Sequence, residues 1–145
     1  MKVQTWLMDI PAKECASLLA DARMGRLGVV VKGRPEIFPV NHVYDLESGR
    51  VTFATNDRTK LHAAKEWPWV SYEIDGVTRA PGGDEGWSVL VVGHVEEITD
   101  TDHIARLEEA RAVLWHPGRG VRWMAIVPEK ITGRRISATA TGDDA

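Results

Sequence analysis

The residues best placed to do chemistry lie in one segment, TFATNDRTKLHAA, at positions 52–64. A predicted strand ends at Thr55, and a predicted helix beyond it carries Arg58, Thr59 and Lys60 in its first turn. A helix start offers free backbone N–H groups and a positive dipole end, and two cations and two hydroxyls lie nearby here. This pattern predicts an anion site whose natural ligand is a phosphate. An ordinary capped helix with solvated charges uses the same residues, so both interpretations stay open.

A second candidate segment is PEIFPVNHVYD, at positions 35–45. It is predicted to form a strand from Glu36 to Tyr44, in which Pro39 cannot donate a ladder hydrogen bond. Backbone groups left unpaired there could face the polar edge of a flat heterocycle, with Asn41 as a further donor. The alternative is a bulged strand in which Asn41 bonds to nearby backbone.

Aromatic and basic residues elsewhere are less specific. The chain has six tryptophans, and Trp87 and Trp123 begin predicted strands. Each could stack on an aromatic cofactor or pack in a dimer interface, although plain core packing is the commoner role. Arg134 and Arg135 are adjacent on a late strand and point to opposite faces, so one of them could reach a ligand.

Several function classes are not expected. A net charge of −3 argues against binding duplex nucleic acid, and no apolar run approaches the ~20 residues of a membrane span. The first residues lack a signal peptide's apolar stretch, and a single cysteine requires no oxidising compartment, so a cytoplasmic protein is expected. No metal site is predicted, because these residues show no metal-binding spacing: Cys15, His42, His62, His94, His103 and His116.

The order of elements predicts a mainly β fold with accessory helices. Helices are predicted from Pro11 to before Gly25, from Arg58 to Lys65 and, after a Thr99–Asp102 capping box, from Asp102 to Val113. Strands are predicted at 26–31, 36–44, 50–56, 70–74 and 87–98, with a closing pair at 123–127 and 130–136 broken at Pro128. Loops are expected at 76–86 and 115–120. About six strands without βαβ alternation predict an antiparallel barrel in one domain over 1–137, followed by a flexible tail at 138–145.

Four segments in this order resemble the pyridoxamine 5′-phosphate oxidase-like family of flavin-binding split barrels. GRLGVVVKGRPEIFPVNHVYD is similar to the family's opening hairpin, and VTFATNDRTKLHAA to its third strand and phosphate-binding turn. GWSVLVVGHVEEITD is similar to the long central strand, and VRWMAIVPEKITGRRI to the closing hairpin. The likeness covers roughly residues 10–137.

The resemblance implies a six-stranded split barrel that forms a homodimer with two FMN sites at the subunit interface. It assigns three groups of residues to the cofactor: Thr55, Thr59 and Lys60, with Arg58 nearby, at the phosphate; Pro39, Val40 and Asn41 at the isoalloxazine ring; and Trp87, Ser88, Trp123 and Arg134 in a contribution from the second subunit.

The implied function is that of an FMN-dependent oxidoreductase acting on a small molecule. Pyridoxamine phosphate oxidases proper are longer and carry C-terminal basic and histidine residues in a pattern absent here, so that particular activity is not expected. Two alternatives stay open. One is a flavin carrier or sensor without turnover, and the other is a relative on the same barrel that binds a deazaflavin or haem, with His42 or His94 as the strand candidates for a haem ligand.

Overall fold

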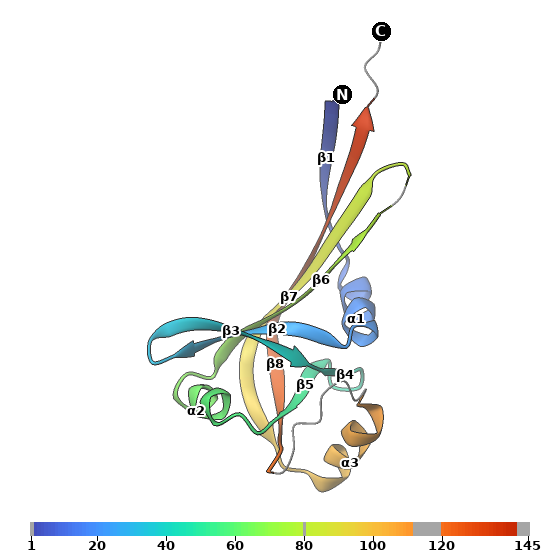
Figure 1. The fold of residues 1–145 in the computed structure, drawn as a ribbon. Coiled ribbons are helices and arrows are strands. Elements are labelled where there is room, and N and C mark those ends of the chain that lie inside the picture. The colour runs from blue at the N-terminus through green and yellow to red at the C-terminus, as the bar shows by residue number, and fades with distance from the viewer. Residues whose placement is uncertain (1, 80, 112–119, 142–145) are drawn as a thin grey trace.

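The computed structural model describes residues 2–79, 81–111 and 120–141 (Figure 1). The helices are α1 (Ala12–Asp21), α2 (Arg58–Glu66) and α3 (Thr101–Ala110). The strands are β1 (Lys2–Asp9), β2 (Met24–Val31), β3 (Arg34–Asn41), β4 (Val43–Asp45), β5 (Arg50–Thr55), β6 (Trp69–Thr78), β7 (Asp84–Ile98) and β8 (Arg122–Thr141).

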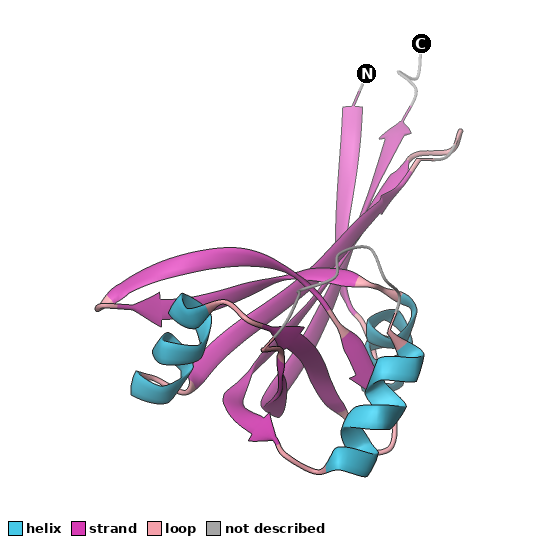
Figure 2. Cartoon of the chain, turned by 60° about the horizontal axis from the view of Figure 1, so that its bottom comes forward, coloured by secondary structure: helices cyan, strands magenta, loops and turns pink. Residues whose placement is uncertain are grey.

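All eight strands join one antiparallel sheet in the order β3-β2-β6-β7-β8-β5-β4, and β1 pairs with β8. The sheet curls on itself, with α2 on one side and with α1 and α3 on the other (Figure 2). This architecture confirms the predicted mainly β split barrel with accessory helices, although eight strands replace the expected six.

The hydrophobic core fills the curl of the sheet. Leu27 and Val29 alternate with more exposed neighbours along β2, which is the pattern of a strand with one buried face. In β5, by contrast, Val51, Thr52 and Phe53 are all buried. The largest fully buried side chain is that of Tyr72, which comes from the middle of β6.

The helices are fixed to the sheet by short apolar stripes and by their caps. Leu19 of α1 is 0% exposed, and Leu107 is the buried residue of α3. The three predicted helices are confirmed, with one change of cap. Asp100, not Thr99, caps α3, because its carboxylate accepts the backbone N–H of Asp102 at 3.1 Å.

The longest strands build an arm that rises from the barrel (Figure 1). We define the arm as β1 together with residues 75–78 of β6, 84–88 of β7 and 134–141 of β8, which pair side by side. The lower halves of β7 and β8 belong to the barrel, where β8 also pairs with β5. The same two strands therefore connect the barrel to the arm.

The arm corrects three predictions. Residues 2–9 form a strand that was not predicted, because its partner lies at the far end of the chain. Residues 76–86, expected to be a loop, mostly belong to the strands of the β6–β7 hairpin. Residues 138–141, assigned to a flexible tail, belong to β8, while 142–145 lie outside the described residues.

Two further strand boundaries differ from the prediction. The long strand expected from Glu36 to Tyr44 is interrupted at His42, which separates β3 from β4. The break expected at Pro128 is a bulge within one continuous β8, where the register with β7 shifts between Val92 and Gly93. In the described part of the chain, no helix is both long enough and apolar enough to span a membrane.

His42 holds the junction of β3 and β4 against the core. Its ring is 5% exposed, and Nε2 lies 2.9 Å from the carbonyl oxygen of Leu19, which can only accept, so Nε2 carries a proton. Nδ1 lies 2.5 Å from the Tyr72 hydroxyl, which is also 3.2 Å from the carbonyl oxygen of Val40. A Cβ on Gly25 would lie 2.5 Å from that hydroxyl oxygen, so the glycine leaves room for the tyrosine.

Burial lowers the pKa of His42 below its ordinary value of 6.5, because a buried imidazolium loses its hydration. Nδ1 of the neutral ring then accepts a hydrogen bond from the Tyr72 hydroxyl. Burial also raises the pKa of Tyr72, so its hydroxyl stays protonated and remains a donor.

We expect the His42 ring to make the fold sensitive to mild acid. Because the unfolded chain binds a proton at His42 more readily than the folded chain, the stability that the neutral ring contributes is present above pH 6.5 and lost as the pH falls below it. In urea unfolding, the free energy of unfolding should fall less for His42→Gln than for wild type as the pH is lowered from about 7.5 to about 5.5. His62→Gln, at an exposed position, is the control. Equal pH dependence in wild type and His42→Gln would contradict this role.

The bulge gives a second prediction. A Cβ at Gly93 would lie 2.0 Å from the carbonyl oxygen of Val127, so Gly93→Ala requires the β7 and β8 backbones to move apart. We expect this substitution to lower the free energy of unfolding by about 1–3 kcal/mol in urea unfolding. Gly82→Ala, where no atom lies within 4 Å of the added Cβ, should change it by less than about 0.5 kcal/mol. Equal effects of the two variants would show that the bulge tolerates a side chain.

Candidate functional site

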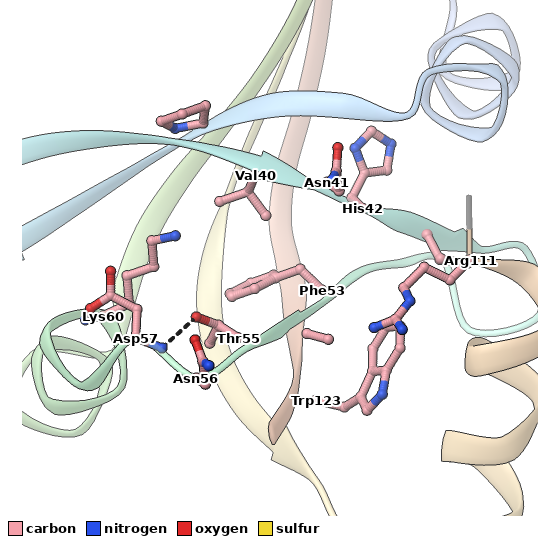
Figure 3. Close-up of a pocket in the computed structure, with 13 residues that line it drawn as sticks. Val40, Asn41, His42, Phe53, Thr55, Asn56, Asp57, Lys60, Arg111 and Trp123 are labelled. Carbon is pink, nitrogen blue, oxygen red and sulfur yellow. Dashed lines mark hydrogen bonds between the residues drawn. The ribbon is translucent and has the colours of Figure 1, made fainter. Parts of the chain in front are cut away.

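A pocket of about 250 Å³ opens between β3, β5, the start of α2 and the end of α3 (Figure 3). These elements come from distant parts of the sequence and meet because the sheet curls. The pocket is lined by Pro39, Val40, Asn41, His42, Val43, Phe53, Ala54, Thr55, Asn56, Asp57, Lys60, Arg111 and Trp123.

One wall of the pocket is the free edge of a strand. Among the described residues, β3 is the end strand of the sheet and pairs with β2 alone, so its other edge has no described strand partner. Pro39 and Asn41 lie on this strand, and the buried Oδ1 of Asn41 has no hydrogen-bond partner within the described residues. Oxygen and nitrogen of a side-chain amide are assigned from their partners, so either can face the pocket. A buried amide without a partner is a group that a polar ligand would satisfy.

The start of α2 forms the opposite end of the pocket. Thr55 is 5% exposed, and its hydroxyl accepts the backbone N–H of Asp57 at 3.0 Å. The Asp57 carboxylate then caps the helix by accepting the N–H of Thr59 at 2.9 Å and that of Lys60 at 3.4 Å. The ordinary helix cap that the sequence left open is therefore present. An anion at this end would depend on the Lys60 ammonium more than on free backbone N–H groups.

Lys60 is a partly buried cation that lies beside the pocket (Figure 3). Its Nζ lies 5.1 Å from the centre of the Phe38 ring, and none of the described carboxylates forms an ion pair with it. Burial lowers the pKa of Lys60, while the charge of Asp57 partly opposes this shift. A bound anion would stabilise the charged ammonium.

Trp123 and Arg111 form a third wall. The Trp123 indole is 3% exposed, and its N–H donates to Glu108 of α3 at 2.9 Å. The Arg111 guanidinium lies 6.0 Å from the Trp123 ring centre and pairs with Glu108 through Nη2 at 3.2 Å. Its Nε and Nη1 are buried and have no partner within the described residues. This wall thus combines an aromatic face with unused donors.

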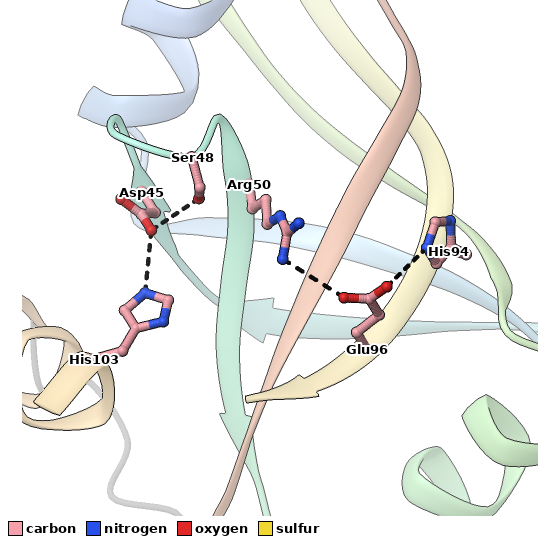
Figure 4. Close-up of polar contacts among 6 residues, drawn as sticks. All are labelled: Asp45, Ser48, Arg50, His94, Glu96 and His103. Carbon is pink, nitrogen blue, oxygen red and sulfur yellow. Dashed lines mark hydrogen bonds and ion pairs between the residues drawn. The ribbon is translucent and has the colours of Figure 1, made fainter. Parts of the chain in front are cut away.

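Two polar networks brace the elements around the pocket (Figure 4). Asp45 Oδ2 accepts from Ser48 Oγ at 2.8 Å and lies 3.1 Å from His103 Nε2, which ties α3 to the β4–β5 turn. Glu96 lies 3.6 Å from Arg50 and 3.2 Å from His94. Ser48 and His103 both contact the carboxylate of Asp45, so this network is not arranged as a nucleophile with its base.

The structure brings together six of the residues that the sequence and the resemblance singled out. These six line the pocket: Pro39, Val40, Asn41, Thr55, Lys60 and Trp123. Trp123 lies in the pocket of its own chain, whereas the resemblance placed it in a contribution from the second subunit.

The other five predicted residues lie elsewhere. Arg58 and Thr59 are exposed on the first turn of α2 and line a neighbouring groove. Trp87 and Ser88 of β7 and Arg134 of β8 lie on the arm, where Ser88 and Arg134 are register partners. Arg135, the neighbour of Arg134, forms ion pairs with Glu14 and Glu85.

Seven residues that line the pocket were not among the predicted cofactor residues: His42, Val43, Phe53, Ala54, Asn56, Asp57 and Arg111. Phe53 was assigned only to a strand, and Arg111 was not considered, because its place depends on how α3 packs. His42 was considered only as a haem ligand, and both of its ring nitrogens are engaged by Tyr72 and Leu19. His94 contacts Glu96 and Trp69 and is not among the residues that line the pocket. Among the described residues, no group of three or more His, Cys, Asp or Glu side chains could hold a metal ion.

Comparisons with known proteins place this geometry in a family. The sequence matches the profile of the family described as pyridoxamine 5′-phosphate oxidase over residues 11–135. It is 32% identical over 140 residues to the uncharacterized protein Rv0080 of Mycobacterium tuberculosis, and the match covers 91% of this chain and 87% of that protein.

Two solved structures are similar over most of their length. The FAD-binding protein from Mycobacterium smegmatis is 32% identical, with a TM-score of 0.71 over 88% of this chain and 98% of that one. A Corynebacterium glutamicum protein, described as a candidate pyridoxamine 5′-phosphate oxidase, is 28% identical, with a TM-score of 0.74 over 90% of this chain and 98% of that one. The family profile spans most of the barrel, and the chain belongs to the pyridoxamine 5′-phosphate oxidase family.

Proposed function

We propose that this chain binds a flavin nucleotide in the pocket and acts as a flavin-dependent oxidoreductase on a small molecule. One observation carries the proposal: the pocket has a buried amide oxygen at one end and a partly buried lysine at the other, and neither has a hydrogen-bond or ion-pair partner among the described residues. A flavin has the matching ends, a polar ring edge and a phosphate. The 32% identical Mycobacterium smegmatis relative, described as an FAD-binding protein, supports a flavin on this fold.

The residues fit the cofactor part by part. The β3 edge at Pro39 and the amide of Asn41 would meet the polar edge of the isoalloxazine ring. Val40 and Phe53, which are 6% and 3% exposed, supply the apolar surface around it. Lys60 would hold the phosphate, as a charge-assisted hydrogen-bond donor beside the Thr55 hydroxyl.

A bound flavin supplies hydride and electron transfer, and the protein contributes position, electrostatics and shielding. Among the described residues that line the pocket, Asp57 caps α2 and both nitrogens of His42 are engaged. Neither is free to move a proton for a substrate. The proposed role of this chain is therefore to bind and orient the reactants.

The cofactor in this proposal is FMN or a nucleotide that contains it. The proposed location of the protein is the cytoplasm.

An oxidoreductase should re-oxidise reduced flavin with a specific acceptor faster than free FMN does. A carrier or sensor would bind flavin with no such acceleration. Tight deazaflavin binding without affinity for FMN would point to a deazaflavin-dependent relative.

The proposal includes a homodimer formed through the arm. One row of register partners crosses its four strands, from Val77 through Gly86 and Ile136 to Leu7. The three side chains of this row are 67%, 47% and 60% exposed in the order Val77, Ile136 and Leu7. Contiguous exposed apolar surface of this kind marks interaction sites.

A dimer through the arm would also give a role to two of the predicted residues that lie on the arm. Ser88 and Arg134 are two residues along their strands from Gly86 and Ile136, so they share a face with the apolar row. Trp87 lies on the opposite face. In the proposed dimer, Ser88 and Arg134 contribute to the partner subunit's cofactor site.

Lys60→Ala should weaken FMN binding without unfolding the protein. The lost charge-assisted hydrogen bond predicts a loss of about 1–3 kcal/mol, or roughly 5- to 150-fold in Kd, measured by flavin fluorescence titration. Lys65→Ala, at an exposed position later on the same helix, is the matched control and should keep the wild-type Kd. An unchanged Kd for Lys60→Ala would remove Lys60 from the site.

Charge on the arm should break the dimer. Leu7→Glu combined with Val77→Glu would bring four carboxylates together in a symmetric interface, so we expect light scattering to report the 16.1 kDa of one chain. Leu46→Glu, at a position that is 72% exposed on the β4–β5 turn, should leave the dimer intact. A wild-type protein that is already monomeric would overturn the proposed dimer.

A further inference from the structure

A groove of about 670 Å³ runs between the β2–β3 turn and α2. Lys32 and Arg34 lie on its β-hairpin wall, and Arg58 and His62 lie on its helix wall. The proposed flavin pocket does not use this groove.

The groove carries more positive charge than its own carboxylates neutralise. Within the described residues, Lys32, Arg34 and Arg58 have no ion pair, although all three are exposed. Two carboxylates line the same groove. Glu66 pairs with His62 at 3.0 Å, which leaves Glu36 as the one carboxylate there without a described partner. Arginine and lysine in this arrangement suit phosphate groups.

The turn that presents two of these cations is tight. Lys32 and Gly33 have φ values of 49° and 77°, the pattern of a two-residue hairpin turn with positive φ at both central positions. Lys32 is the one non-glycine residue with positive φ in the described part of the chain. Asparagine or aspartate is usual at such a position, and a lysine costs about 1 kcal/mol of local strain. This lysine therefore occupies a place that backbone preference does not favour.

The groove lies next to the phosphate end of the pocket. Arg58 and Thr59 line the groove, while their neighbours Asp57 and Lys60 line the pocket. β3 likewise borders both the groove and the pocket, because Arg34 lines the groove and Asn41 lines the pocket. At about 3.3 Å per residue, the strand spans roughly 23 Å between these two residues. That span suits an extended dinucleotide better than a mononucleotide.

We propose that this groove binds the adenosine 5′-phosphate half of FAD, with Lys32, Arg34 and Arg58 around its phosphate. The proposal rests on the proposed flavin site, because the flavin half must lie in the pocket. Val31 and Ala63 supply an apolar floor for the adenine. The chain is then selective for FAD over FMN.

The test is isothermal titration of the full-length protein with FMN, FAD and AMP. We expect wild type to bind FAD at least tenfold more tightly than FMN. Lys32→Ser combined with Arg34→Ser should bring the Kd for FAD close to that for FMN, while the Kd for FMN stays within twofold of wild type. Arg106→Ser combined with Lys130→Ser, which removes two exposed cations outside the groove, is the matched control and should keep the preference for FAD.

The titrations distinguish binding in the FAD groove from binding in the flavin pocket. A protein that binds neither FMN nor FAD would overturn both. Binding of FMN and FAD with equal affinity, unchanged by the double variant, would overturn the FAD groove and leave the flavin pocket standing. AMP binding to the FMN-loaded protein that is lost in the double variant, together with equal wild-type affinity for FMN and FAD, would assign the groove to a separate adenine nucleotide and overturn the FAD assignment.

Discussion

The pairing of β7 with β8 is the constraint on which the rest of the molecule depends. These strands are 15 and 20 residues long and stay paired from the barrel to the arm. Such long strands need a local bend to serve both regions, and the bulge at Gly93 and Pro128 interrupts their register inside the barrel. The close approach of the Val127 carbonyl to Gly93 explains why this position has no side chain.

The pocket exists because the curled sheet ends at β3. Within the described residues, no strand covers the free edge of β3, and the β5–α2 connection brings Thr55 and Lys60 opposite it. Leu19, His42 and Tyr72 hold the end of this edge against the core through hydrogen bonds. A binding site built on a strand edge and one helix start needs few dedicated residues, since backbone groups supply part of its polarity.

Much of the fold could be predicted from the sequence because its signals are local. The helices follow apolar periodicity and caps, and the central strands follow runs of β-branched residues. The segments around Asn41 and Lys60 could be singled out in the same way, because Pro39 and the helix start are visible in the sequence itself. These local signals were enough to indicate the family, and the family profile confirms it.

The features that were missed depend on contacts between distant residues. The strand at 2–9 pairs with residues 134–141, and no local pattern records a pairing across nearly the whole chain. Glycine and proline around residues 76–86 indicated a loop, yet the backbone ladder with β8 extends the strands through much of it. Arg111 enters the pocket only because α3 docks through Glu108 and His103, which the sequence could not reveal.

The most direct test of the flavin pocket is an absorbance spectrum of the protein purified without added cofactor, repeated after incubation with FMN and desalting. We predict that the two visible bands of an oxidised flavin remain with the protein after desalting, in equal molar amount to the chain. A protein that stays colourless in both spectra would contradict flavin binding and leave the barrel with a pocket for a different ligand.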